Sequence, residues 1–150
     1  MKLSPNMLGG LAGAIALNLV HEYARKRFKD APAVNRIAEG GIAKVANTFG
    51  QPSPTPEVKY GMAMTGDLVA NTFYYSTIAK EEGGNIWLRG LCIGLIGGLG
   101  ALFLPKQVGL DDTPVTRTPL TKVLTVAWYT IGGVVAAATV QALRRQQQQG

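Results

Sequence analysis

Asp67 is the residue best placed to do chemistry in this sequence, because it is a carboxylate inside a long apolar stretch. If a helix begins at Tyr60, Asp67 lies about 10 Å along it at 1.5 Å per residue. In a membrane a charge at that depth costs on the order of 3 kcal/mol, so the side chain should face protein or water. Asn71 follows one turn later on the same helical face, and Tyr74 continues this polar edge.

A second polar group ends another apolar stretch nearer the N-terminus. Asn18, His21 and Glu22 are three or four residues apart, which places them on one helical face. They would approach the membrane side from which Asp67 descends. The spacing therefore predicts one intramembrane polar cluster, made of Asn18, His21, Glu22, Asp67, Asn71 and Tyr74.

Two interpretations of this cluster stay open from the sequence. In the first, Asp67 titrates, with or without His21, and relays protons or cations. In the second, Asp67 is hydrogen-bonded to Asn18 or to a backbone group and holds two helices together. Polar contacts between membrane helices average well under about 2 kcal/mol. In the second interpretation Asp67 would therefore add modestly to the association of the two helices.

The sequence contains few residues that could support metal-dependent or covalent catalysis. It contains one histidine and one cysteine, Cys92, which are too few for a zinc or haem site built from one chain. It has no nucleophile elbow, phosphate-binding glycine loop or metal-spaced histidine motif. We therefore expect no enzyme activity, no cofactor and no metal. A lipid-modifying enzyme with Asp67, His21 and Glu22 as acid–base groups is the weakest alternative.

The polar side chains must be positioned by apolar stretches that are long enough to cross a bilayer. A hydrocarbon core of about 30 Å requires about 17 to 25 helical residues. We predict an all-α integral membrane four-helix bundle, a single domain over residues 1–150, with spans at 7–23, 60–79, 86–104 and 123–143. A signal peptide over residues 1–16 competes for the first stretch, but its charged region holds only Lys2.

An amphipathic helix is predicted between the first two spans, over residues 32–49. Apolar residues recur there at helical spacing among polar ones, so the helix should lie in the membrane interface or beneath the bundle. Trp128 and Tyr129 stand where interfacial aromatic residues are expected in the fourth span. The glutamine tract after Arg145 is expected to be disordered.

Small residues one turn apart recur in three of the predicted spans. Such stripes let helices approach closely, either within the bundle or between subunits. The positions predicted to pack helices are Gly9, Gly13, Gly90, Gly94, Gly98, Gly133 and Ala137.

The formal charge of +6 comes mainly from Lys and Arg in the two long connections. The positive-inside rule then places these connections in the cytoplasm and both termini on the periplasmic side. A basic run, Arg25, Lys26, Arg27 and Lys29, either contacts anionic lipid headgroups or only sets the topology. Because the basic residues flank spans and form no aromatic-lined groove, we expect lipids and not nucleic acid as partners.

Several short motifs together resemble a group of uncharacterised small bacterial inner-membrane proteins. They are His21-Glu22-x-x-Arg25, Gly66-Asp67-Leu68-x-Ala70-Asn71-x-x-Tyr74-Tyr75, Leu104-Pro105 and Arg117-Thr118. The resemblance implies a multi-pass protein of the bacterial inner membrane and brings no activity with it.

The function expected from these features is that of a non-catalytic structural or accessory membrane subunit. It would use its small-residue faces to pack against itself or against a larger membrane complex. The alternative is a small proton- or cation-coupled permease or channel that uses Asp67.

Overall fold

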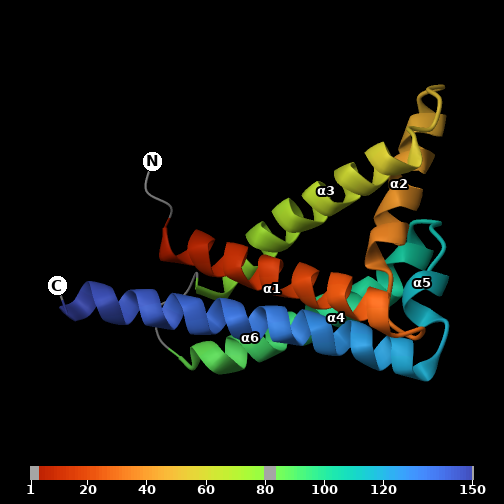
Figure 1. Cartoon of the computed structure of the whole chain (residues 1–150). Coiled ribbons are helices and arrows are strands. Elements are labelled where there is room, and N and C mark those ends of the chain that lie inside the picture. Colours follow the sequence, from red (N-terminus) through yellow and green to blue (C-terminus); the bar gives the residue numbers. More distant parts are fainter. Residues whose placement is uncertain (1–3, 80–83, 150) are drawn as a thin grey trace.

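The computed structural model describes residues 4–79 and 84–149, and all regular secondary structure in these ranges is helical (Figure 1). This confirms the prediction of an all-α chain. The elements are α1 (Pro5–Arg27), α2 (Val34–Thr48), α3 (Pro56–Ser76), the short 3-10 helix η1 (Thr77–Ala79), α4 (Ile86–Gln107), α5 (Thr113–Thr116) and α6 (Pro119–Gln149).

The helices begin and end at residues with suitable capping chemistry. The side chains of Ser4, Thr55 and Asn85 accept hydrogen bonds from the first free backbone N–H groups of α1, α3 and α4. Gly50 and Gly109 follow α2 and α4 with positive φ, a conformation that glycine adopts without strain.

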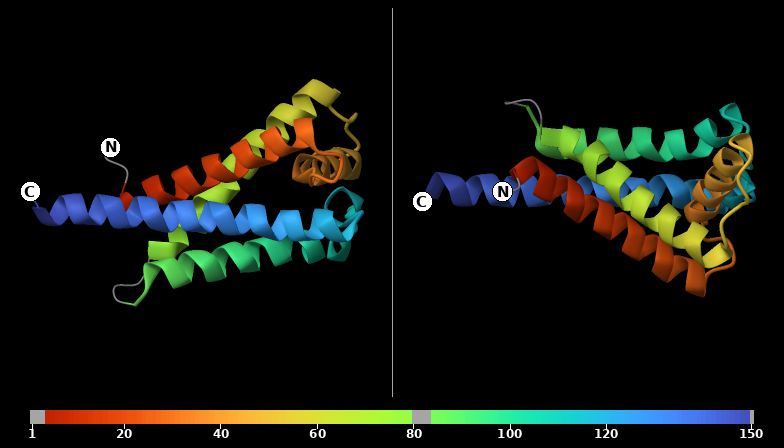
Figure 2. Two further views of the ribbon diagram at one scale, coloured as in Figure 1. Left: turned by 60° about the horizontal axis from the view of Figure 1, so that its bottom comes forward. Right: turned by 90° about the horizontal axis from the view of Figure 1, so that it is seen from above.

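The long helix α6 forms the centre of the molecule, with α1 and α4 packed on different sides of it (Figure 2). Helix α3 packs along α1 but touches α4 and α6 at few positions. It leans away from α4 and α6 toward one end of the molecule, where α2 packs against it. The arrangement is therefore a bundle that is closed at one end and spread at the other.

Glycines bring α4 and α6 into close contact. A Cβ atom built on Gly94 would lie 2.5 Å from Thr130 Cα, and one on Gly98 would lie 2.6 Å from Val126 Cα. On the other side of α6, a Cβ on Gly13 would lie 2.5 Å from the Gly132 carbonyl oxygen. The remaining predicted packing residues meet in the same two contacts: Gly90 with Gly133 and Ala137, and Gly9 with α6 at Val140. These small residues are thus occupied inside the chain, and their role between chains stays a prediction.

Only α4 and α6 among the described helices are long and apolar enough to cross a membrane by length and composition. The described residues thus contain two candidate spans within an all-α fold, and the predicted four-span bundle is not confirmed. Polar residues lie inside the apolar stretches of the other two long helices: Asn18, His21 and Glu22 in α1, and Lys59, Asp67 and Asn71 in α3. Such residues lower the mean hydropathy of a helix even where the rest of it is apolar.

The helices α1, α4 and α6 extend beyond the predicted spans of 7–23, 86–104 and 123–143, and α3 begins before the predicted residue 60. The interfacial helix expected over 32–49 is α2 at Val34–Thr48, and α6 runs through the glutamine tract to Gln149. The prediction of disorder for this tract was wrong, because glutamine is a good helix former and continues a helix already begun in the apolar stretch.

The linker between α1 and α2 is hydrogen-bonded to α5, to Arg117 after it and to the first turn of α6. The Thr121 hydroxyl, fully buried, donates to the Asp30 carbonyl at 2.9 Å, and Ala33 N–H donates to the Pro114 carbonyl at 3.0 Å. Arg117 donates to the carbonyls of Lys29 and Ala31. These bonds join two connections that are far apart in the sequence.

Candidate functional site

Asp67 lies between two amide donors, one on its own helix and one on α1. Asn18 Nδ2 donates to Asp67 Oδ2 at 3.0 Å, and Asn71 Nδ2 donates to Asp67 Oδ1 at 2.9 Å. Asn18 and Asn71 also donate to backbone carbonyls one turn earlier in their helices, at 3.0 Å each. Each carboxylate oxygen of Asp67 thus has a directed partner, and the bond to Asn18 joins α1 to α3.

His21 lies beside this carboxylate and lacks a hydrogen bond at one nitrogen. Its Nε2 atom is buried and has no hydrogen-bond partner among the described residues. The His21 ring meets the Tyr129 ring edge-on, with 6.1 Å between the ring centroids and 69° between their planes. Tyr129 is 8% exposed, so it is a buried residue of the bundle and not the interfacial residue that its position suggested.

A small cavity separates these groups from the basic end of α1. It has a volume of about 10 Å³, close to the space one water molecule needs. Asn18, His21, Glu22, Arg25 and Asp67 supply most of its polar lining. The structure therefore brings four of the six predicted cluster residues, Asn18, His21, Glu22 and Asp67, to one cavity, and Asn71 joins them through its bond to Asp67.

An ion pair stands at the outer edge of this cavity. Arg25 Nη2 lies 3.0 Å from Glu22 Oε2, and the Arg25 guanidinium carbon lies 5.7 Å from the centre of the Tyr60 ring. Both ionic side chains retain solvent exposure, so the pair contributes little to stability.

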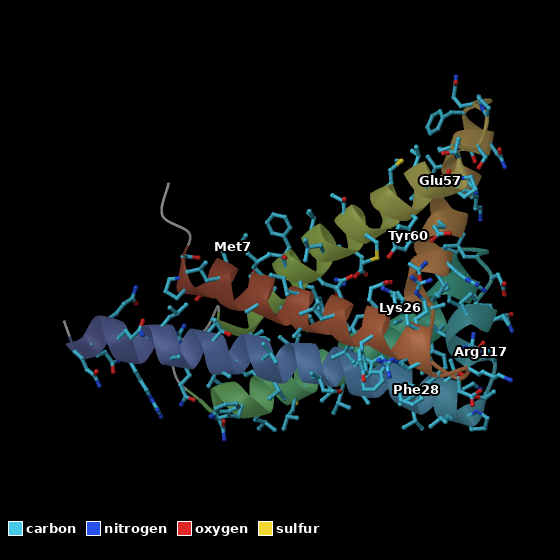
Figure 3. All side chains as sticks on the ribbon, viewed as in Figure 1. Met7, Lys26, Phe28, Glu57, Tyr60 and Arg117 are labelled. Carbon is cyan, nitrogen blue, oxygen red and sulfur yellow. The ribbon has the colours of Figure 1, made fainter. Side chains whose placement is uncertain are left out.

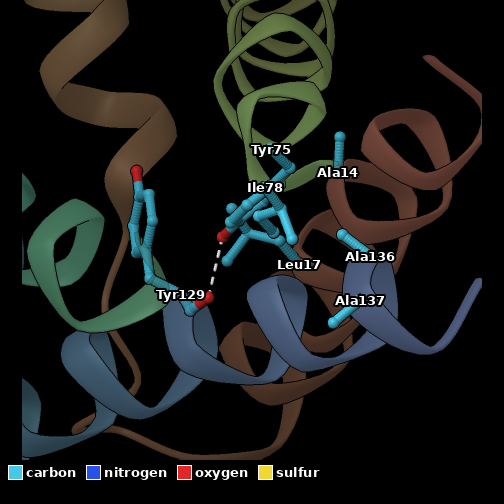
Figure 4. Close-up of a cluster of buried hydrophobic side chains, with 7 residues drawn as sticks. All are labelled: Ala14, Leu17, Tyr75, Ile78, Tyr129, Ala136 and Ala137. Carbon is cyan, nitrogen blue, oxygen red and sulfur yellow. Dashed lines mark hydrogen bonds between the residues drawn. The ribbon is translucent and has the colours of Figure 1, made fainter. Parts of the chain in front are cut away.

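Tyr74 is not part of the hydrogen-bonded cluster around Asp67. Its hydroxyl donates to the Ile93 carbonyl at 2.8 Å and so connects α3 to α4. The neighbouring Tyr75 is fully buried, and its hydroxyl donates to the Tyr129 carbonyl at 2.8 Å (Figure 4). The Tyr75 contact belongs to a dry core of residues from α1, α3, η1 and α6: Ala14, Leu17, Tyr75, Ile78, Tyr129, Ala136 and Ala137.

A wide apolar cleft lies between α3 and α4 where the two helices separate. Its volume is about 670 Å³, and α2 closes one end of it through Val34, Ile37 and Ala38. The polar side chains on its walls are Asn71, Tyr74 and Tyr129. Asn71 and Tyr129 therefore border both the cleft and the surroundings of Asp67.

A second pocket of about 230 Å³ lies at the α2 end of the cleft and shares Ile37 and Leu110 with it. Its charged lining consists of Arg36, Arg117 and Asp111. Hydrogen bonds from the side chain and backbone of Thr113 lower the pKa of Asp111. Sequence reasoning did not identify this pocket, because it forms where α2 meets the distant connection between α4 and α6.

The predicted headgroup-binding residues, Arg25, Lys26, Arg27 and Lys29, are all exposed. They lie at the same end of the molecule as Arg117, as the labelled Lys26 and Arg117 in Figure 3 illustrate. In residues 4–79 and 84–149, no three His, Cys, Asp or Glu side chains gather in a way that could hold a metal ion.

Comparison of the chain with models of known protein families, with curated proteins and with solved structures gave no match.

Proposed function

We propose that this chain is a small, non-catalytic, multi-pass membrane protein that serves as a structural or accessory subunit. The observation that carries the proposal is the distribution of apolar side chains. Large ones point outward along the long helices, including Leu19 at 65%, Phe73 at 59% and Phe103 at 64% exposed. A water-soluble protein of this size would bury such residues, whereas lipid solvates them.

The interior has the complementary composition. The buried faces of α1, α4 and α6 are rich in glycine, alanine and threonine, the residues that let membrane helices pack closely. Only 22% of the most apolar segment of α4 is buried inside the chain. A core helix of a soluble protein would be buried over most of its length.

Helices α1 and α3 belong to the same membrane domain in this proposal, which then has four spans and both termini on the periplasmic side of a bacterial inner membrane. Two features support the extension to α1 and α3. Their outward faces carry Ile15, Leu19, Val69 and Phe73, and the charge nearest their middle, Asp67, is turned toward Asn18. That arrangement is the one expected of a carboxylate that must avoid lipid.

An accessory role is favoured over transport by the way the polar groups are used. The Asn18–Asp67–Asn71 contacts join helices, and the layer beyond them is filled by Tyr75, Ile78 and Leu17, all fully buried. Since the glycine stripes are occupied within the chain, association would use the outward apolar faces of the helices.

Purification in a mild detergent tests this proposal. We expect the full-length protein to run as an oligomer, or to co-purify with another membrane protein, when its mass is measured by light scattering and chemical crosslinking. A strictly monomeric protein with no co-purifying membrane protein would refute the accessory role.

A proton- or cation-coupled permease is the second candidate, and one observation favours it. His21 Nε2 is buried without a partner next to a cavity that Asp67 also lines. Ionisable groups that meet at a cavity inside a membrane domain are candidates for a proton relay. Ion flux through proteoliposomes distinguishes this candidate from the first.

A further inference from the structure

The cleft between α3 and α4 has the dimensions of one membrane leaflet. At 1.5 Å per residue, its α4 wall from Ile96 to Pro105 is about 14 Å long. Half of a hydrocarbon core of about 30 Å is about 15 Å. The wall is formed by apolar and small residues, and in the proposed membrane orientation it opens sideways toward lipid. An acyl chain fits the depth and the chemistry of this surface.

The charged side chains lie in the pocket at the α2 end of the cleft, and none among the described residues lines the cleft itself. Arg36 and Arg117 line the adjoining pocket, opposed by a single carboxylate, that of Asp111, so the pocket is positive overall. Both bonds from Arg117 to backbone carbonyls come from its Nη2 atom, which fixes the guanidinium at the pocket wall. A guanidinium has five N–H donors, and its fork geometry suits a phosphate.

We propose that this composite surface is a binding site for an anionic phospholipid, with an acyl chain in the α3–α4 cleft and the phosphate at Arg36 and Arg117. The proposal rests on the membrane placement described under the proposed function. It goes beyond surface contacts of the exposed basic run, because it assigns one lipid molecule to one site. Such a lipid would fill the space that α3 and α4 leave open.

Native mass spectrometry of the full-length protein in detergent tests the site, with added phosphatidylglycerol as the probe. Gly100 lines the cleft, and a Cβ there would meet only Leu104 Cδ1, at 3.5 Å. Gly100→Leu should therefore occupy the cleft without distorting the helices and weaken lipid binding at least about tenfold. Gly66→Leu is the matched control, because nothing lies within 4 Å of a Cβ at Gly66 and it does not line the cleft. Binding to the control should equal that of the wild type.

The charge half of the site is tested by Arg36→Gln. We expect about tenfold weaker phosphatidylglycerol binding, and a smaller change for the control Lys26→Gln, which removes the same charge from the exposed basic run. Arg36→Gln leaves the Arg117 bonds to the linker in place, so folding is preserved.

Equal binding of all variants would overturn the proposal, and so would equal binding of phosphatidylethanolamine with the same acyl chains. The measurement counts lipids per chain in any oligomeric state. Its outcome is therefore independent of whether the protein associates with partners.

Discussion

At the scale of single residues, the carboxylate of Asp67 is best understood through the two amides that face it. Asn18 and Asn71 each direct an Nδ2 group at a different oxygen of the carboxylate. An amide donor left without an acceptor inside a membrane protein costs free energy, since lipid offers no replacement. The three side chains are therefore energetically dependent on one another.

We expect Asp67→Asn to lower the free energy of unfolding by about 1 kcal/mol, because one of the two amide donors then faces another donor. Unfolding in mixed detergent micelles measures this change, with the exposed Thr65→Ala on the same helix as the control. In proteoliposomes we expect wild type and Asp67→Asn to show the same ion flux as empty vesicles. Wild-type flux abolished by Asp67→Asn at unchanged stability would instead establish the permease.

Residue spacing predicted much of this site but did not predict that Tyr129 belongs to it. The prediction that Asp67, Asn71 and Asn18 meet needed two observations. Asp67 and Asn71 are one helical turn apart, and Asn18 was expected at the same depth in the membrane as Asp67. The position of Tyr129 was mistaken, because no local pattern tells which face of α6 meets α1. Tyr74 lies on a neighbouring face of α3 and bonds to α4, which its spacing from Asp67 could not reveal.

At the scale of helices, backbone-to-backbone proximity decides which substitutions the bundle tolerates. Gly94 and Gly100 are in the same helix, α4, and differ in their surroundings. A Cβ on Gly94 would lie 2.8 Å from the Tyr129 carbonyl oxygen as well as against Thr130, whereas Gly100 faces the cleft. Comparing the same substitution at these two glycines therefore distinguishes the effect of packing from that of helix propensity.

Gly94→Ala should destabilise the protein by about 1 to 3 kcal/mol, because α4 and α6 must move apart to admit one methyl group. Gly100→Ala should be neutral or stabilising by up to about 1 kcal/mol, since alanine favours the helix and meets no obstacle. Thermal melting in detergent, followed by circular dichroism, compares the two. Equal melting temperatures would contradict the close packing of α4 on α6.

The existence of the long helices could be predicted from apolar periodicity and length, but their arrangement could not. The sequence indicated small-residue faces on α1, α4 and α6 without specifying their partners. The divergence of α3 from α4 is a tertiary feature, set by the contacts of α3 with α1 and α2. The cleft that results from it therefore has no signature in the sequence.

At the scale of the whole molecule, the outward apolar surface predicts that the protein lies in a membrane. The reactivity of its single thiol tests this prediction. Cys92 on α4 is exposed in the isolated chain. It lies about 9 Å along α4, a helix that is long enough to cross a bilayer. In water this thiol would react freely, whereas in lipid a charged reagent could not reach it.

We expect Cys92 to resist a membrane-impermeant maleimide in intact vesicles and to react after solubilisation in SDS. The variant Cys92→Ala with Ser53→Cys moves the single thiol to the exposed linker before α3. This linker thiol should react in inverted vesicles and not in right-side-out ones if the long connections are cytoplasmic. Rapid labelling of Cys92 in both vesicle types would exclude the membrane placement.

The junction at Ala79 is a further constraint on the angle of α3, in addition to its contacts with α1 and α2. The Ala79 carbonyl accepts from Asn6 Nδ2 at 3.5 Å and from Arg144 Nη2 at 2.9 Å, which anchors the end of α3 and η1 to both terminal helices. From this anchor, the 21 residues of α3 form a lever about 30 Å long. A tilt of only about 5° there moves the far end of α3 by about 2 to 3 Å, given a lever set by the helical rise. A small change of geometry at this polar junction would therefore alter the width of the cleft at the opposite end of α3.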